Sequence, residues 1–507
     1  MKSKALCIVE GSFGVWTSVR IPLLTLLTCA LLSTGCATKT APTRAEIQKQ
    51  SATTSALAPT STWKIGGADG RVSDNWLATF NDTQLDALVR EAIANNPDLR
   101  ISATRVEQAS QYVELSKSAL RPAVNLFGTG GYNLADGSSA LQGVIIGASW
   151  ELDLWGRLRY GRNATQEAYV STLADFEFAR QSLAATTARS WFSASETWLQ
   201  LQIANEMVKS AQQLVYYAET RQKVGVGREQ DVTLARTNLG NFQDNVAQIR
   251  LAHAQTLRAL ELLLGRYPAA ELKARQELDA FPGPVPVGMP LEMLERRPDM
   301  IAAERRVAVA FNRVGEAKAA RLPRISLNAS VADISSQVLQ LRDDYQNPSA
   351  GVGGRIVAPI YQGGALNTQV AIRTIEQKEA VAQYARMALR AIGDVENALA
   401  AGNTLAEREQ LLQRIVADNQ RTLDLEQASF RIGKTDLRSV QQQQLNLFAA
   451  RLSLLRVQSE QLSQRVNLHL ALGGSFENAS VPDQNAGIPA ANASDTAPAE
   501  STMTAQP

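Results

Sequence analysis

Residues 141–154 read LQGVIIGASWELDL, and the alternation in this stretch decides the fold of one end of the protein. The even positions from Val144 to Leu154 are all apolar, whereas most odd positions are glycine, serine or an acidic residue. Because successive side chains of a β-strand point to opposite faces, the pattern predicts a strand with one apolar face. Its length is typical of a transmembrane β-strand, which has about 9 to 11 residues.

Three further segments are predicted to pair with this strand. They are AVNLFGTGGYN at 123–133, ISLNASVADI at 325–334 and GVGGRIVAPIY at 351–361. An outer-membrane barrel needs at least about eight strands to close, and an open sheet edge cannot face lipid. Four strands therefore predict that several copies share one barrel. The alternative is a pair of soluble hairpins packed on helices.

The second half of the chain repeats the first. NPDL at 96–99 is matched by RPDM at 297–300, at an offset of 201 residues. LLLG at 262–265 is matched by LALG at 470–473, at an offset of 208. Landmarks that recur in order at nearly constant spacing indicate an internal duplication, with one insertion between the halves.

Long helical segments fill most of each half. The first half is predicted to hold a helix over 83–120, interrupted at Pro97, and a longer helical stretch over 160–264, broken at the glycines of VGVG, 224–227. Gly433 supplies the equivalent break in the second half, because glycine tolerates a positive φ at a helix C-terminus. The seam of the longer stretch has apolar residues in steps of four, three and four, at Met207, Ala211, Leu214 and Ala218. Antiparallel coiled-coil hairpins use helices of this kind.

The N-terminus has the features of an export signal. An apolar stretch at 21–32 follows Lys2, Lys4 and Arg20 and precedes STGC, whose last residue is Cys36. STGC resembles a bacterial lipobox, in which the cysteine is acylated and becomes the first mature residue, although Ser33 stands where such boxes usually have an aliphatic residue. The alternative is an ordinary signal peptide with an incidental cysteine.

Composition and spacing then divide the chain of 507 residues. We predict a lipoprotein signal peptide at 1–35, a tether at 36–62, a first structural repeat at 63–280, a proline-rich connector at 281–290, a second repeat at 291–473 and a disordered tail at 474–507. Lys and Arg total 51 against 49 Asp and Glu, a formal net charge of +2. A nucleic-acid-binding protein usually has a basic excess, so no nucleic-acid partner is expected.

The sequence shows no pattern typical of an enzyme. Its two histidines, His253 and His469, each fall inside a predicted helix, where we expect core packing. GKT at 433–435 lacks the earlier glycine of a phosphate-binding loop, because that position is Ala428. We expect no enzyme activity, no metal site and no cofactor apart from a covalent lipid on Cys36.

In their order along the chain, these segments resemble the TolC-type outer-membrane efflux factors, and most closely their lipoprotein branch, called NodT-like or OprM-like. The matching segments are STGC at 33–36, WLATFNDTQLDALVREAIANNPDLRISATRVEQA at 76–109, SWELDLWGRLR at 149–159, GMPLEMLERRPDM at 288–300, AKAARLPRISL at 317–327 and PIYQGG at 359–364. The resemblance implies a mixed α and β fold: a trimeric outer-membrane β-barrel, with four strands per chain and 12 in total, that continues into a long periplasmic α-helical coiled-coil barrel.

The resemblance also implies partners and functional residues. A homotrimer in the outer-membrane lipid would meet a periplasmic adaptor protein and an inner-membrane pump of the resistance nodulation division type. Its adaptor-contact tips would be Val224, Gly225, Val226 and Gly227 in one hairpin and Ile432, Gly433, Lys434 and Thr435 in the other. Candidates for the periplasmic gate are Arg431, Asp436, Arg438, Ser439 and Gln442, with Asp436 paired to a neighbouring or intersubunit arginine.

We therefore expect an outer-membrane channel of a tripartite efflux system, lipid-anchored and with a large periplasmic part. It would give small molecules, such as drugs or toxic compounds, a passive exit. One alternative is the outer-membrane channel of a type I protein secretion system. The other is a periplasmic coiled-coil scaffold lipoprotein without a pore.

Overall fold

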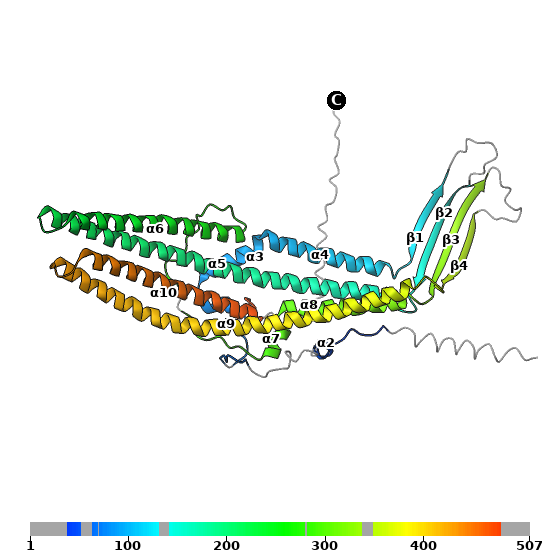
Figure 1. The fold of residues 1–507 in the computed structure, drawn as a ribbon. Helices are drawn as coiled ribbons and strands as arrows, with labels where there is room; N and C mark the ends of the chain where they lie inside the picture. Colours follow the sequence, from blue (N-terminus) through cyan, green and yellow to red (C-terminus); the bar gives the residue numbers. More distant parts are fainter. Residues whose placement is uncertain are drawn as a thin grey trace, which may run out of the picture.

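The computed structural model describes residues 38–51, 63–68, 70–130, 141–278, 281–336 and 348–477. Long helices lie side by side along one axis, a β-sheet stands at one end, and the helical hairpins end in tips at the other (Figure 1). The predicted signal peptide at 1–35, Cys36 and residues 478–507 of the predicted tail lie outside the described residues.

The two repeats contain the same succession of elements. The first has α3 (Thr83–Asn95), α4 (Pro97–Ser118), β1 (Ala123–Thr129), β2 (Leu141–Leu152), α5 (Arg157–Lys223) and α6 (Glu229–Leu263). The second has α7 (Pro290–Arg296), α8 (Pro298–Ala319), β3 (Arg324–Ser336), β4 (Ser349–Val357), α9 (Ala365–Arg431) and α10 (Leu437–Ala471). Helix α2 (Arg44–Ser51) precedes the first repeat, and the short 3-10 helix η2 (Trp76–Phe80) lies within it, before α3.

Matching helix lengths confirm the predicted duplication. Helices α4 and α8 have 22 residues each, α5 and α9 have 67, and α6 and α10 have 35. Strand β3 starts 201 residues after β1, whereas β4 starts 208 residues after β2. The extra seven residues therefore lie in the β-hairpin of the second repeat.

The NPDL and RPDM motifs perform the same structural task with different side chains. Asn96 caps α4 by accepting hydrogen bonds from the backbone N–H groups of Asp98 and Leu99, and its own amide donates to the Leu263 carbonyl at 3.0 Å. In the second repeat, the guanidinium of Arg297 donates to the Ala471 carbonyl at 3.1 Å. Leu263 and Ala471 end α6 and α10, so each motif joins the start of a short helix to the end of a long hairpin.

The long helices form one layer that changes partners midway. Toward the sheet, α5 packs against α4 and α8, and α8 packs against α9. Toward the tips, α5 packs against α6 and α10, and α10 packs against α9. The predicted seam on α5 is confirmed, because its four residues are all buried.

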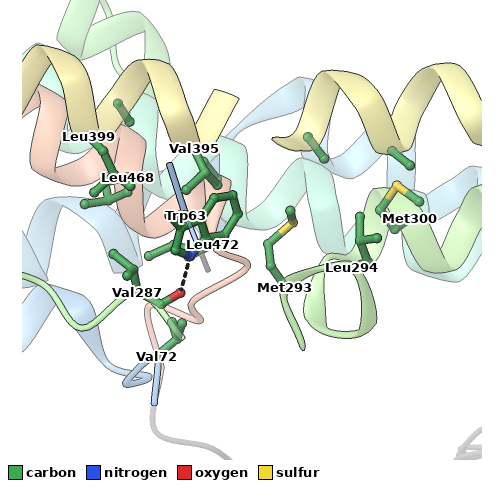
Figure 2. Close-up of a cluster of buried hydrophobic side chains, with 14 of the residues drawn as sticks. Trp63, Val72, Val287, Met293, Leu294, Met300, Val395, Leu399, Leu468 and Leu472 are labelled. Atoms are coloured by element: carbon green, nitrogen blue, oxygen red, sulfur yellow. Dashed lines mark hydrogen bonds between the residues drawn. The ribbon is translucent and has the colours of Figure 1, made fainter. Parts of the chain in front are cut away.

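Segments outside this layer cover one of its faces at mid-length. The Trp63 indole donates to the carbonyl oxygens of Val287 at 3.4 Å and Gly288 at 3.1 Å. Its ring lies between Val395 of α9 and Leu472, which directly follows α10 (Figure 2). A second cluster places η2 and α3 against α5, α6 and α10. We call these segments, together with α2 and α7, the collar.

The structure corrects three predicted boundaries. The predicted tether contains α2, whose Ile47 is fully buried and whose Arg44 forms an ion pair with Glu304 at 2.6 Å. Pro290 begins α7 and so belongs to a helix, not to the connector. The ordered chain continues beyond 473, because Phe476 is buried among the α3 and α5 residues.

Candidate functional site

The sheet exposes an apolar face. The strand order of the sheet is β1-β2-β3-β4, and all neighbouring strands are antiparallel. The register aligns the even residues of β2 with odd residues of β3. The exposed apolar residues on this face are Val124, Leu126, Val144, Ile146, Trp150, Leu327, Val331, Val352 and Ile356. The opposite face carries mainly small or polar residues, among them Asn125, Ser149, Asn328, Ser330 and Arg355. This two-faced sheet matches the wall of a membrane barrel with a polar interior.

Strands β1 and β4 leave the sheet with two free edges. Within the described residues, β1 pairs only with β2, and β4 pairs only with β3. Unpaired N–H and C=O groups on such edges are costly in lipid and are satisfied by closing a barrel. The sheet is therefore part of a structure that other copies complete.

Two tryptophans mark the junction between the sheet and the helices. The Trp150 indole donates to the Leu120 carbonyl at 3.0 Å, and the Trp155 indole donates to the Pro323 carbonyl at 2.7 Å. Tryptophan is enriched where a membrane meets water. The pair is consistent with a membrane boundary at the base of the sheet. None of the helices in the described part of the chain is long and apolar enough to cross a membrane.

The opposite end of the molecule consists of two hairpin tips that expose apolar side chains. Gly225 and Gly433 turn the chain with φ values of 82° and 77°, a conformation that glycine adopts readily. The side chains of Val224, Val226 and Ile432 are 67%, 66% and 68% exposed. Gly227, Lys434 and Thr435 complete the predicted contact set, which the structure brings together at one end of the molecule. Whether an adaptor binds there stays a prediction.

The predicted gate residues cluster around the second tip. Asp436 caps α10, because its carboxylate accepts from the backbone N–H and the hydroxyl of Ser439, each at 2.9 Å, and these bonds lower the pKa of Asp436. Gln442 donates to Asn446 on the same helix. Arg438 is exposed beside them. The contact of Asp436 within its own chain is thus a helix cap, and its pairing with an intersubunit arginine stays a prediction.

Two contacts that the sequence analysis missed connect the tips to each other. The Arg221 guanidinium on α5 donates to the Phe430 carbonyl on α9 at 3.0 Å and lies 5.0 Å from the centre of the Phe430 ring. The Arg431 guanidinium lies 5.5 Å from the centre of the Tyr217 ring. Both contacts hold the two hairpins of one chain together. Only the concentration of arginine and aromatic residues near the breaks could have suggested them.

His469 packs in the core as predicted, whereas His253 is only partly buried. His469 is 1% exposed and stacks on Trp76 with ring centres 6.0 Å apart, and burial lowers its pKa to about 3. A ring nitrogen of His253 lies 2.9 Å from the Thr197 hydroxyl, and burial lowers the pKa of His253. The described residues contain no group of side chains arranged to hold a metal ion.

Comparison with known proteins assigns the family. Residues 88–266 and 289–474 match the family described as outer membrane efflux protein. The chain belongs to this family. The two matched ranges correspond to the two structural repeats, which confirms the resemblance seen in the sequence.

Several outer membrane efflux proteins are similar over most of the chain. The cation efflux system protein CusC of Escherichia coli is 29% identical over 423 residues, which cover 82% of this chain and 91% of that protein. The probable efflux pump outer membrane protein SepC of Pseudomonas putida is 30% identical over 419 residues, which cover 80% of this chain and 86% of SepC. The toluene efflux pump outer membrane protein TtgC of the same species is 28% identical over 490 residues, which cover 92% and 98%.

Solved structures of such proteins share the fold. A crystal structure of CusC aligns with a TM-score of 0.75 at 26% identity and covers 82% of this chain and 98% of that chain. The Campylobacter jejuni CmeC outer membrane channel aligns with a TM-score of 0.76 at 22% identity and covers 83% and 93%. The predicted TolC-type fold class is confirmed. The efflux interpretation is confirmed as well, whereas a scaffold without a pore would leave the free sheet edges and this likeness unexplained.

Proposed function

We propose that three copies of this outer membrane efflux protein assemble into one conduit through which small molecules, such as drugs or toxic compounds, leave the cell passively. The four-stranded sheet with two free edges and one apolar face carries the proposal. Three such sheets supply twelve strands, an even number within the range of bacterial outer-membrane barrels. The long helical layers of the three copies would close in the same way into a tunnel.

The tips are the proposed docking surface for the other components of a tripartite pump. Val224, Val226 and Ile432 offer exposed apolar side chains to a periplasmic adaptor. The exported compound and the energy would come from an inner-membrane pump, which we propose to be of the resistance nodulation division type. The role of this chain is conformational: its hairpins separate and the compound diffuses out.

A lipid anchor on Cys36 is part of the proposal. Helix α2 supports it, because the docked Ile47 and Arg44 hold the mature N-terminal region on the second repeat. An acyl chain on Cys36 could then reach the membrane through the few residues before α2. Mass spectrometry of the N-terminal peptide tests this directly. An unmodified mature terminus at another residue would remove the anchor from the proposal without affecting the channel.

Two experiments test the proposed channel. Cryo-electron microscopy of protein extracted from outer membranes in mild detergent is expected to show a three-fold hollow cylinder. Deletion of the gene is expected to sensitise cells to small toxic compounds, and the wild-type gene should restore resistance. A monomer, or a rod without a lumen, would contradict the assembly. Loss of a secreted protein with unchanged sensitivity would instead assign the channel to protein secretion.

A further inference from the structure

An arginine-lined hollow lies where α8 and α10 meet end to end between α5 and α9. It has a volume of about 540 Å³, a size typical of sites for small organic ligands. Three arginines line it, Arg189 from α5, Arg297 from the start of α8 and Arg390 from α9, against one acidic residue, Asp394. Asn397, Gln464 and Asn467 complete most of its polar wall.

The two carboxylates near the hollow both pair with Arg297. Arg297 pairs with Asp299 at 2.7 Å and with Asp394 at 3.7 Å. Within the described part of the chain, no carboxylate forms an ion pair with Arg189 or Arg390. Arg189 and Arg390 therefore have no ion-pair partner among the described residues, and three arginines against Asp299 and Asp394 leave the hollow with a net charge of +1.

Arg189 is held in place by neutral groups. Its guanidinium donates to the Asn467 side-chain oxygen at 2.6 Å and to the Thr186 hydroxyl at 3.0 Å. The Asn467 amide in turn donates to Gln464 at 3.2 Å. Burial without a carboxylate partner lowers the pKa of Arg189, although arginine keeps its charge at neutral pH. A partly desolvated cation that lacks a counter-ion favours the arrival of an anion.

The hollow opens on the face of the helical layer that the collar leaves bare. On α10, Arg465 and His469 point to the collar, where they meet Phe80 and Trp76 of η2. Asn467 is two residues from each, so its direction differs from theirs by about 160° on a helix with 3.6 residues per turn. In a closed ring of helices the bulky collar belongs outside, where the circumference is larger. The bare face then lines the interior.

We propose that this hollow binds small organic anions on the lumen wall, through a carboxylate, sulfonate or phosphate group held between Arg189 and Arg390. The inference rests on the proposed trimeric channel, which would carry three such sites at one level. Each site would raise the local concentration of anionic compounds at mid-tunnel. Because the hollow is open to solvent and binding is screened by salt, the anion can leave again.

The test uses full-length protein in lipid nanodiscs and the fluorescent trisulfonate pyranine as the probe, titrated at low salt. Wild-type protein is expected to bind it and to release it as the salt concentration rises. The exposed Arg390→Gln variant should weaken binding roughly 10-fold or more, since a hydrogen bond to a charged group is worth about 1.5–3 kcal/mol. The Arg189→Gln/Arg390→Gln double variant should weaken it further, and Arg390→Lys should retain part of it.

Arg408→Gln is the matched control. Arg408 is exposed on the same face of α9, 18 residues or about 27 Å nearer the tips, so its loss removes the same charge from the same wall without touching the hollow. The affinity of the Arg408→Gln variant for pyranine should stay within about twofold of the wild type. Equal losses in Arg408→Gln and Arg390→Gln, or no binding by the wild type, would overturn the proposal. Electron-microscopy images of the same preparation separate this outcome from a failure of the proposed channel. A hollow trimer that does not bind pyranine contradicts the anion site alone.

Discussion

The contact between Arg221 and Phe430 predicts how firmly the tips are held closed. The two residues lie on the two hairpins of one chain, where the guanidinium donates to the Phe430 carbonyl at 3.0 Å and lies 5.0 Å from its ring centre. Opening that separates the hairpins must break both interactions. Arg221→Ala removes them in advance and leaves the apolar cluster beneath the tips in place.

The magnitude follows from the two contacts. A hydrogen bond to a charged group contributes about 1.5–3 kcal/mol, and an exposed cation–π contact contributes about 0.5–1 kcal/mol. Their combined loss, about 2–4 kcal/mol per chain, would shift the closed-to-open equilibrium of each hairpin pair by roughly 30- to 900-fold. Arg221→Lys should give a smaller shift, since lysine keeps the charge and lacks the planar fork.

Single-channel conductance in planar bilayers measures the effect directly. Wild-type channels are expected to stay mostly closed, and Arg221→Ala channels should open far more often. Susceptibility of cells to a large antibiotic that the outer membrane normally excludes gives a second reading. Arg228→Ala is the control, because Arg228 is an exposed arginine at the first tip whose loss should leave conductance unchanged. Equal conductance in the wild type and Arg221→Ala would refute the proposed role of this contact in holding the tips closed.

Three further predictions concern stability and assembly. Because burial lowers the pKa of His469 from its ordinary value of 6.5 to about 3, the contribution of this residue to stability is complete above about pH 6.5 and falls as the pH drops. The loss between pH 7 and pH 5 should be about 2 kcal/mol; thermal unfolding followed by circular dichroism should show it, and His469→Gln should abolish it. Gly265→Ala should lower the unfolding temperature, because Gly265 has a φ of 71° and an added Cβ would lie 2.8 Å from the Asn95 carbonyl oxygen. Gly240→Ala, inside α6 with open space around it, should instead stabilise by about 0.5–1 kcal/mol, and equal effects of the two variants would contradict this reasoning. Ile146→Arg on the apolar sheet face should cost about 2–4 kcal/mol and reduce the yield of trimer in outer membranes, whereas Ser330→Arg on the polar face should not; equal yields would argue against the assigned lipid face.

The fold was predictable wherever the spacing of apolar residues along the sequence indicated which side chains are buried or face lipid. Alternation in residues 141–154 identified a strand with two unlike faces, and the buried face of α5 followed from apolar spacing alone. The duplication was visible because both copies keep the same landmarks. Each of these signals depends on residues that are neighbours in the sequence.

Other features depend on single residues or distant partners. Ile47 is one apolar residue in a polar stretch, and Phe476 is one aromatic residue next to a polar tail, so neither produces a periodic signal. Arg221 and Phe430 are 209 residues apart, and nothing near either residue specifies the other. Arg189 lacks an acidic partner because the residue that α10 places against it is the neutral Asn467. Such sites emerge from packing between helices.

The equal lengths of the paired helices limit how this protein can change size. Both repeats have a 67-residue helix followed by a 35-residue helix, so the two tips end at the same level. Inserting one turn into α5 would raise one tip above the other unless α6, α9 and α10 grew by the same amount. The β-hairpin of the second repeat, by contrast, holds seven extra residues with no counterpart. The β-hairpins can therefore change length independently of each other. At the tip end, the length of the hairpins can change only if all four helices change by the same amount.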